Sequence, residues 1–248
     1  MPTSIRVDGL FNLRDLGGYR SNLFPNARIR HGIIYRSGHL ANITDFACDR
    51  LHELGVSLII NLTTPGETEL FSGVVVLPDI PSWAHHLRAP YKNTVLSIAD
   101  QVEKYKHVRT AGPTGVAQAY FKMLKSRPDV FQEILTRMIV YRTGVVCALL
   151  LSLGGVSDDV VADDYSFSEQ NLQHMLPRMV ELTLEVDPGV EDVEGLARVV
   201  TECRKDTMLI TLEIVRMEYG GVYEYVKDCC NVSQGDIERI RRALLTEI

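Results

Sequence analysis

The stretch MIVYRTGVVCALLLSLGG, residues 138–155, decides how we interpret this chain. Four apolar residues are followed by Arg142-Thr143-Gly144, and an apolar run from Val145 to Leu153 comes next. This order predicts a strand, a turn and a helix, as at the C-terminal edge of a parallel sheet. The first amides of such a helix can hold an anion, and a guanidinium adds a planar, charged pair of donors. We therefore predict an anion site at Arg142, Thr143 and Gly144. The alternative is that Arg142 only ends a strand and Gly144 only permits a turn.

The composition is that of a globular protein. Of the 248 residues, 46% are hydrophobic and 23% are charged, which is close to the average for folded domains. We expect a single α/β domain over residues 1–248, because no Pro-, Gly- or Ser-rich linker divides the chain. The formal net charge of −6 argues against nucleic acid as the main partner, because phosphate backbones are bound by clustered Lys and Arg.

Neither a membrane nor a metal is indicated. The longest apolar run, Val145 to Leu153, is much shorter than a membrane span, so we expect a cytoplasmic protein. The cysteines are odd in number and show no zinc-ligand spacing, which predicts reduced and mostly buried thiols and no cofactor; they are Cys48, Cys147, Cys203, Cys229 and Cys230.

The first third of the chain predicts most of the strands. Ile33 to Tyr35 is a short β-type run, and the continuous apolar run from Val56 to Leu62 predicts a parallel strand that is buried on both faces. Between them, Thr44 is a suitable N-cap for a helix that Gly55 ends. Residues 84–89 predict a further strand.

The rest of the chain is predicted to be mainly helical. Residues 90–113 show no clear pattern, whereas residues 116–125 and 130–138 have the spacing of amphipathic helices. From about residue 157 to residue 248 helices follow one another, with helix starts at Ser157 and Ser168.

Four motifs, in this order, resemble the tyrosine-phosphatase-like family of bacteria and fungi. They are Asn12-Leu-Arg14-Asp15-Leu-Gly17-Gly18, Tyr35-Arg36-Ser37-Gly38, the strand ending at Asn61-Leu62 before Glu67, and Arg142-Thr143-Gly144 leading into the helix and into DDVVADDY at residues 158–165. The resemblance covers nearly the whole chain. It implies a cysteine-phosphatase-like α/β fold, with a short, mainly parallel sheet flanked by helices and a helical C-terminal part.

The resemblance fails at the residues that carry the family's chemistry. Such phosphatases use a cysteine thiolate that precedes the phosphate-binding arginine by six positions. Six residues beyond the five cysteines lie Leu54, Leu153, Leu209, Gly235 and Asp236, and six residues before Arg142 lies Thr136. The segment HCxxGKD of the family therefore has no counterpart before Arg142. In the second loop, Asn61 and Thr63 stand where the family has Asp and Arg.

Three explanations remain open at this point. The chain could be a pseudophosphatase that keeps the fold as a binding protein. It could be an enzyme of another class that reuses the same cleft to modify a small molecule, with His85, His86, Asp15 or Glu67 as acid–base candidates. It could also be an ordinary phosphatase that has lost a short segment, in the gene or in the reading of it.

The resemblance also divides the charged residues by role. Arg142, Thr143 and Gly144 match the remaining phosphate-loop positions, so the expected partner is a phosphate-containing or other anionic small molecule, or a phosphoprotein. We expect Asn12, Arg14, Asp15, Arg36 and Glu67 to have structural roles behind that loop. Arg14, Asp15 and Arg36 lie among apolar residues, where an unpaired charge is unfavourable, and an ion-pair network is the expected solution. His85 and His86 point to opposite faces of a strand and cannot share one metal ion from it.

Overall fold

The computed structural model describes residues 3–38, 40, 43–62, 82–88, 98–137 and 144–248. The strands are β1 Thr3–Ser4, β2 Arg14–Asp15, β3 Ala27–Ile29, β4 Tyr35–Arg36, β5 Leu58–Asn61, β6 His85–Arg88 and β7 Leu245–Glu247. The helices are α1 Asp45–Glu53, α3 Ile98–Ser126, α4 Pro128–Arg137, α5 Gly144–Leu153, α6 Asp158–Ser166, α7 Ser168–Leu172, α8 Leu176–Val186, α9 Val193–Thr201, α10 Lys205–Tyr219, α11 Val222–Glu224 and α12 Gln234–Leu244, with a π-helical turn at Tyr225–Cys229. The α/β class predicted from the sequence is confirmed.

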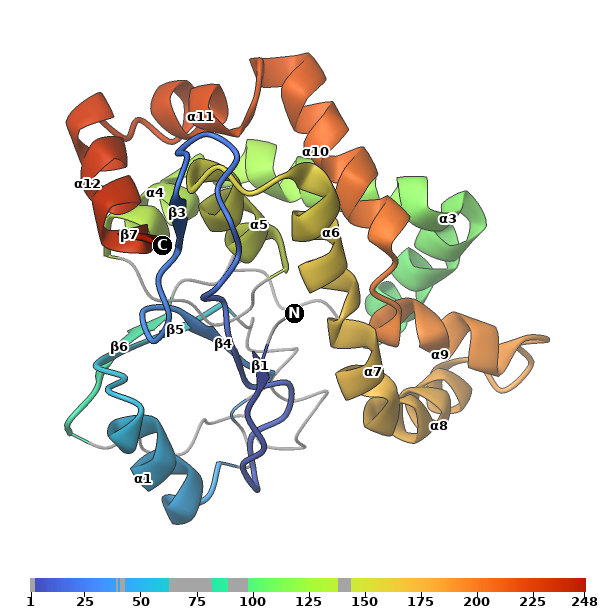
Figure 1. Ribbon diagram of the computed structural model, residues 1–248. Helices are drawn as coiled ribbons and strands as arrows, with labels where there is room; N and C mark the ends of the chain where they lie inside the picture. Colours follow the sequence, from blue (N-terminus) through green and yellow to red (C-terminus); the bar gives the residue numbers. More distant parts are fainter. Residues whose placement is uncertain (1–2, 39, 41–42, 63–81, 89–97, 138–143) are drawn as a thin grey trace.

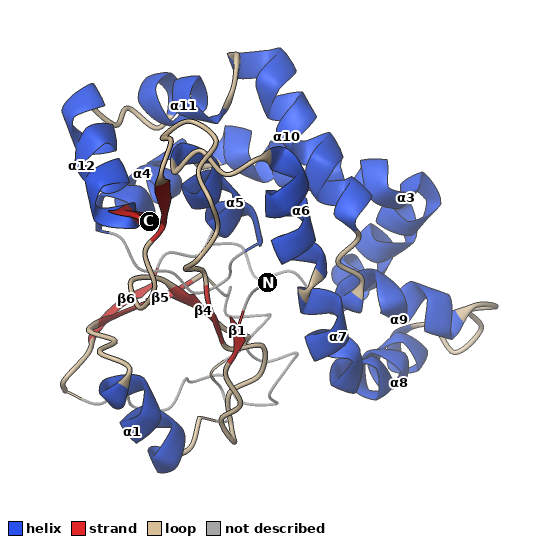
Figure 2. Ribbon diagram, in the orientation of Figure 1, coloured by secondary structure: helices blue, strands red, loops and turns tan. Residues whose placement is uncertain are grey.

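The described strands run in mixed directions. β5 and β6 form a parallel pair, as expected for the apolar run before Leu62. β1, β2 and β4 form an antiparallel sheet, and β3 and β7 form a separate antiparallel pair. β1, β2 and β4 come from neighbouring N-terminal segments and pair without a helical crossover, whereas β3 and β7 come from distant parts of the chain. β1, β4, β5 and β6 lie on the same side of the molecule as α1, whereas β3 and β7 lie beside α12 on the side of the other helices (Figures 1 and 2).

Helix α5 is the centre of the main hydrophobic core. All of its residues from Val145 to Leu151 are buried, and so is Leu153. It packs against α6 and α11, and Figure 1 shows it enclosed by the C-terminal helices. A helix that is apolar on every side is stable only when it is surrounded by protein. The sequence predicted this helix from Val145 to Leu153, and the structure confirms it.

Strand β5 joins two cores. Ile60 belongs to the main core, whereas Ile59 packs with the smaller core beneath α1, which includes Leu51 and Val56. Successive side chains of a strand point to opposite faces, so this strand is buried on both sides, as its continuous apolar sequence predicted. The N-cap of α1 is also confirmed, because the Thr44 hydroxyl accepts a hydrogen bond from the amide of Ala47 at 3.1 Å.

Two parts of the chain differ from the sequence prediction. Helix α3 begins at Ile98, although residues 90–113 showed no helical pattern, and it is interrupted at Gly112 with φ 59°. The sequence of its first half is polar, so no hydrophobic period was visible there. The helix as a whole packs against α8, α9 and α10. The last strand, β7, was not expected. It is a three-residue edge strand whose partner β3 lies more than 200 residues earlier.

Gly144 illustrates how closely α5 packs. A Cβ atom at this position would lie 2.8 Å from the ring of Tyr165, which is a buried side chain of α6. The structure therefore gives Gly144 a packing role at the start of the helix, independent of any ligand.

We predict that Gly144→Ala destabilises the protein by about 1–3 kcal/mol, the usual effect of overpacking a filled core. Gly235→Ala is the matched control, because a Cβ there has its nearest neighbour at 3.9 Å and Gly235 lies in a helix. The control should be neutral or slightly stabilising. Urea unfolding followed by circular dichroism measures both, and equal midpoints for the two variants would contradict the packing argument.

Candidate functional site

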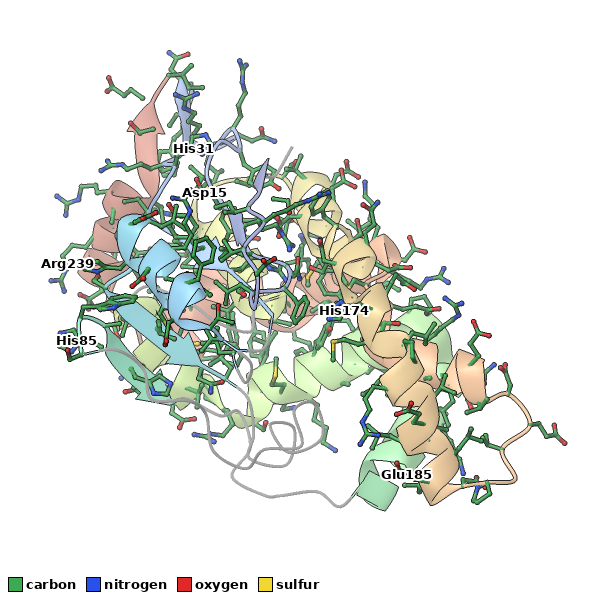
Figure 3. The ribbon with its side chains drawn as sticks, turned by 90° about the horizontal axis from the view of Figure 1, so that it is seen from below. Asp15, His31, His85, His174, Glu185 and Arg239 are labelled. Carbon is green, nitrogen blue, oxygen red and sulfur yellow. The ribbon has the colours of Figure 1, made fainter. Side chains whose placement is uncertain are left out.

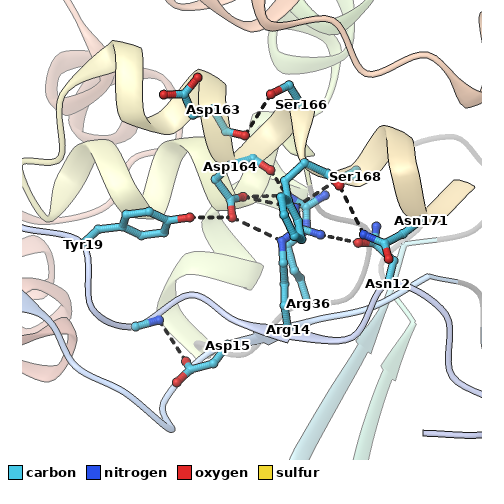
Figure 4. A network of polar contacts seen from close by, with 12 residues as sticks. Asn12, Arg14, Asp15, Tyr19, Arg36, Asp163, Asp164, Ser166, Ser168 and Asn171 are labelled. Carbon is cyan, nitrogen blue, oxygen red and sulfur yellow. Dashed lines mark hydrogen bonds and ion pairs between the residues drawn. The ribbon is translucent and has the colours of Figure 1, made fainter. Parts of the chain in front are cut away.

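A buried ion-pair network joins the N-terminal strands to the helices. Arg14 on β2 and Arg36 on β4 stand directly opposite each other in the antiparallel pairing. Both contact Asp164 of α6: Arg14 Nε donates to Oδ1 at 3.2 Å, and Arg36 Nη1 donates to Oδ2 at 2.9 Å. The three residues are 0%, 4% and 2% exposed. Figure 4 shows the carboxylate between the Tyr19 hydroxyl on one side and the two guanidinium groups on the other.

Arg14 is fully bonded in this network. Its Nη2 donates to the Asp164 carbonyl at 2.7 Å and to the Ser168 hydroxyl at 2.9 Å, and its Nη1 donates to Asn12 Oδ1. The guanidinium also lies over the ring of Phe167, 5.6 Å from the centroid. Arg36 is different: among the described residues its only hydrogen bond joins Nη1 to Asp164, and its buried Nε has no partner there.

The charges of the network explain the shifted pKa values. Burial raises the pKa of Asp164, but the charges of Arg36 and Arg14 and the hydrogen bonds from Arg14 and Tyr19 outweigh it and hold that pKa below its usual value. Burial and then the charge of Arg36 lower the pKa of Arg14. The Tyr19 hydroxyl donates to Asp164 Oδ1 at 3.1 Å, and its pKa is raised, first by burial and then by the carboxylate. The network therefore contains two cations, one anion and a neutral phenol.

Asp15 takes no part in this network, although it follows Arg14 in the sequence. Neighbouring residues of a strand point to opposite faces, and Asp15 faces His31 instead, with Oδ2 2.9 Å from Nδ1. The amides of Gly17 and Gly32 also donate to its carboxylate, at 2.9 and 3.0 Å. A Cβ at Gly17 would lie 2.4 Å from the His31 Cα, so the pair of glycines in the motif leaves room for His31. Figure 3 shows Asp15 and His31 side by side.

The other residues named from the sequence are distributed as follows. Arg142, Thr143, Glu67 and Thr63 lie outside the described residues, so the anion site and the role of Glu67 stay predictions. Gly144 begins α5. His85 and His86 are exposed on β6, and His85 lies apart from the Asp15–His31 pair (Figure 3). Thr136 is exposed on α4.

The sequence analysis missed Asp164, Tyr19 and His31. Asp164 looked like one more surface acid in DDVVADDY, yet Asp163 beside it is exposed and bonded to Lys205, 2.7 Å away. A signal was present: Asp164 lies three residues after Val161 and one before Tyr165, on the buried face of α6. A carboxylate at a core position requires buried cations. His31 gave no such signal, because its partner Asp15 is 16 residues earlier.

Burial raises the pKa of four of the five cysteine thiols. Burial raises the pKa of Cys147 to about 12, of Cys203 to about 11 and of Cys230 to about 12. The pKa of Cys48 is raised as well, by burial and then by Asp45 and Asp49. Within the described ranges, no group of three or more His, Cys, Asp or Glu side chains could hold a metal ion. No helix there is long and apolar enough to cross a membrane.

With this geometry in view, the comparisons identify the class of protein. The profile of the tyrosine phosphatase family matches residues 5–246, so the chain belongs to that family. A protein of Cupriavidus necator named "Putative tyrosine-protein phosphatase" is 22% identical over 96% of this chain and 86% of its own length. A tyrosine-protein phosphatase of Nostoc commune is 23% identical over 83% of this chain and 72% of its own length. The resemblance seen in the sequence is confirmed.

We predict that Asp164→Asn destabilises the protein by about 3–5 kcal/mol, because it leaves two buried guanidinium groups without a counter-charge. Asp163→Asn is the control on the same helix and should leave stability nearly unchanged, since Asp163 is exposed. Urea unfolding measures both variants. Equal losses in the two variants, or none in either, would show that the network does not hold the strands to α6.

The Asp164 carboxylate predicts how the free energy of unfolding depends on pH. Because the folded-state pKa of Asp164 lies below the ordinary value of 3.8, its stabilising effect is complete above the unfolded pKa and is lost as the pH falls through the folded pKa. The free energy of unfolding of the parent protein minus that of Asp164→Asn should be constant from pH 7 to pH 5 and shrink below pH 4. A difference that grows on acidification would contradict the assignment.

Proposed function

We propose that this chain is a phosphatase-like binding protein that recognises an anionic group and does not hydrolyse phosphate esters through a cysteine. The observation that carries the proposal is the sequence spacing: none of the five cysteines precedes an arginine by six positions. Family membership suggests phosphorylated ligands, and Arg142, Thr143 and Gly144 are the proposed remnant of the phosphate loop.

The environment of the thiols supports this proposal. A nucleophilic cysteine needs a lowered pKa, usually from a helix N-terminus or a neighbouring cation. Cys147 lies in the first turn of α5 and feels the charge of Arg36, yet burial dominates and its pKa rises to about 12. At neutral pH it is a neutral core side chain. Cys203 and Cys230 are buried in the same way.

A second candidate function rests on the Asp15–His31 pair. When the Asp15 carboxylate accepts a hydrogen bond from His31 Nδ1–H, Nε2 is the ring nitrogen that remains to act as a base. The His31 side chain is 56% exposed. This is the arrangement of a general base that activates water, and it favours the alternative of a small-molecule enzyme with non-cysteine chemistry. No described nucleophile or bound substrate accompanies it, so we place it second.

We predict that the purified protein does not hydrolyse aryl phosphates above background and shows no burst of product, because no thiolate is positioned to attack phosphorus. The assay is turnover of p-nitrophenyl phosphate, with each of the five cysteines changed to Ser in separate variants. Vanadate-sensitive turnover lost in one of them would overturn the proposal. Turnover that survives all five changes but is lost in His31→Gln would favour the second function.

An insertion variant tests whether the loop was lost recently or whether the chain was adapted to another function long ago. Adding His-Cys-Thr-Ala-Gly-Lys-Asp between Tyr141 and Arg142 restores the six-residue spacing between Cys and Arg. Activity of the inserted protein would show that the rest of the chain still supports the family's chemistry and that the segment was lost recently. A folded, cooperatively melting but inert protein would show that the chain has been adapted to another use, in agreement with Asn61 and Thr63.

A further inference from the structure

A second pair of opposed arginines lies on the surface of the molecule. Arg20 and Arg28 face each other across an antiparallel bridge. Two backbone hydrogen bonds, of 2.9 and 2.8 Å, join the neighbours of Arg20 to the neighbours of Arg28 on either side of the bridge. The pair itself is therefore of the non-hydrogen-bonded type, in which opposite Cα atoms are only about 4.5 Å apart and the side chains are closest.

This pair has no counter-charge among the described residues. Neither Arg20 nor Arg28 forms an ion pair or a side-chain hydrogen bond there, and both are exposed. Like charges directly opposite each other destabilise a sheet. The buried pair of arginines has Asp164 between its guanidinium groups, whereas no described acid relieves the repulsion in the exposed pair. A bound anion would relieve it.

The two arginines belong to one face of a small sheet. β3 pairs with β7 along its other edge, and Arg28 stands opposite Thr246 (Figure 1). Ile29 is buried in the main core, so alternation directs Arg28 and Arg30 away from the core, and the ladder of backbone bonds continues to Arg30. Glu247 follows Thr246 and therefore lies on the opposite face.

Arg30 adds a third cation to this face. Its Nη2 donates to the carbonyl of Leu245 at 2.9 Å, and it forms no ion pair within the described ranges. Ile248, 59% exposed, continues the ladder of β7 at the other end. In a chain with a formal net charge of −6, positive charge is concentrated here without an acid. We call this surface the arginine face; it consists of Arg20, Arg28, Arg30 and Thr246.

The arginine face matches an extended acidic segment better than a lipid surface. Guanidinium groups pair with carboxylates through two parallel hydrogen bonds. Arg28 and Arg30 are two positions apart, which is the spacing of side chains on one face of an extended chain. Such a segment contacts only this face. A lipid surface would also bring the negative charge of the rest of the chain close to anionic headgroups, which repel it.

We propose that the arginine face binds an acidic segment of a partner protein. Carboxylates of the segment pair with Arg20 and Arg28, and an apolar side chain packs on Ile248. The bound carboxylates relieve the repulsion of the exposed pair, as Asp164 does in the buried one. This inference goes beyond the proposed function and does not rest on it, because neither Arg142 nor a cysteine takes part.

The experiment titrates the full chain into fluorescein-labelled hexaglutamate and follows the anisotropy, with labelled hexaglutamine as the uncharged control peptide. Arg20→Gln/Arg28→Gln should weaken binding about tenfold, because an exposed ion pair contributes about threefold. Arg178→Gln/Arg204→Gln is the matched control. It removes the same two charges from exposed arginines outside the face and should change the affinity less than twofold.

The free protein offers an independent measurement. Arg20→Gln should raise the urea midpoint at low salt, because it removes the repulsion, although it makes the net charge more negative. The gain should shrink at about 1 M NaCl, where the screening length is about 3 Å. Arg178→Gln, which breaks ion pairs with Glu181 and Glu185, should bring no such gain. Hexaglutamate should raise the Tm of the parent and not that of Arg20→Gln/Arg28→Gln.

The outcomes separate this inference from the proposed function. Equal affinity of the parent and of Arg20→Gln/Arg28→Gln for hexaglutamate, or no binding by the parent, overturns the inference. Binding to vesicles of phosphatidylserine and phosphatidylcholine without binding to hexaglutamate overturns it as well, because the partner is then a membrane. Cysteine-dependent hydrolysis of p-nitrophenyl phosphate overturns the proposed function and leaves this inference standing.

Discussion

Two arginines face each other across a pair of strands, and the rest of the arrangement depends on how that repulsion is resolved. Arg14 and Arg36 are directly opposed on β2 and β4, and like charges in such a position destabilise a sheet. The carboxylate of Asp164, on a helix about 130 to 150 residues later in the chain, lies between them. Docking of α6 therefore stabilises the sheet in this register. The repulsion between two neighbouring arginines therefore favours one particular long-range contact, the one with Asp164. A pair of apolar residues at these positions would select its partner less specifically.

Helix α5 provides the complementary constraint. Helix α5 is buried on every side and packs against α6. Helix α6, which carries Asp164, is therefore held both by hydrophobic packing against α5 and by the ion pairs with the two arginines. Neither constraint uses a nucleophilic cysteine. The described contacts that fix α6 are thus structural, and they hold the fold whether or not the chain carries the family's chemistry.

What could be predicted from the sequence was local. The continuous apolar run before Leu62 indicated a strand buried on both faces, and Thr44 indicated a helix start, because each signal lies within a few residues of its effect. The polar first half of α3 and the edge strand β7 could not be predicted, since tertiary packing and a distant partner determine them. In the network, the sequence analysis named Arg14 and Arg36 but not the acid that pairs with them. Four aspartates of DDVVADDY were equivalent by composition, and only burial distinguishes Asp164.

The motif Arg14-Asp15 also shows why sequence adjacency is a poor guide to shared chemistry. The two side chains leave β2 on opposite faces: Arg14 enters the buried network, whereas Asp15 orients an exposed histidine. One dipeptide therefore supplies one residue to the buried network and one to the candidate acid–base pair. The two parts differ in how far solvent limits them. The cluster at Asp164 is enclosed, so a single uncompensated charge there has a strong effect on stability. The exposed ring of His31 leaves its pair with Asp15 open to water, which weakens the electrostatic interaction between them. The stabilising role of the first group and any acid–base chemistry at the second are thus separable, because the two groups share no hydrogen bond among the described residues.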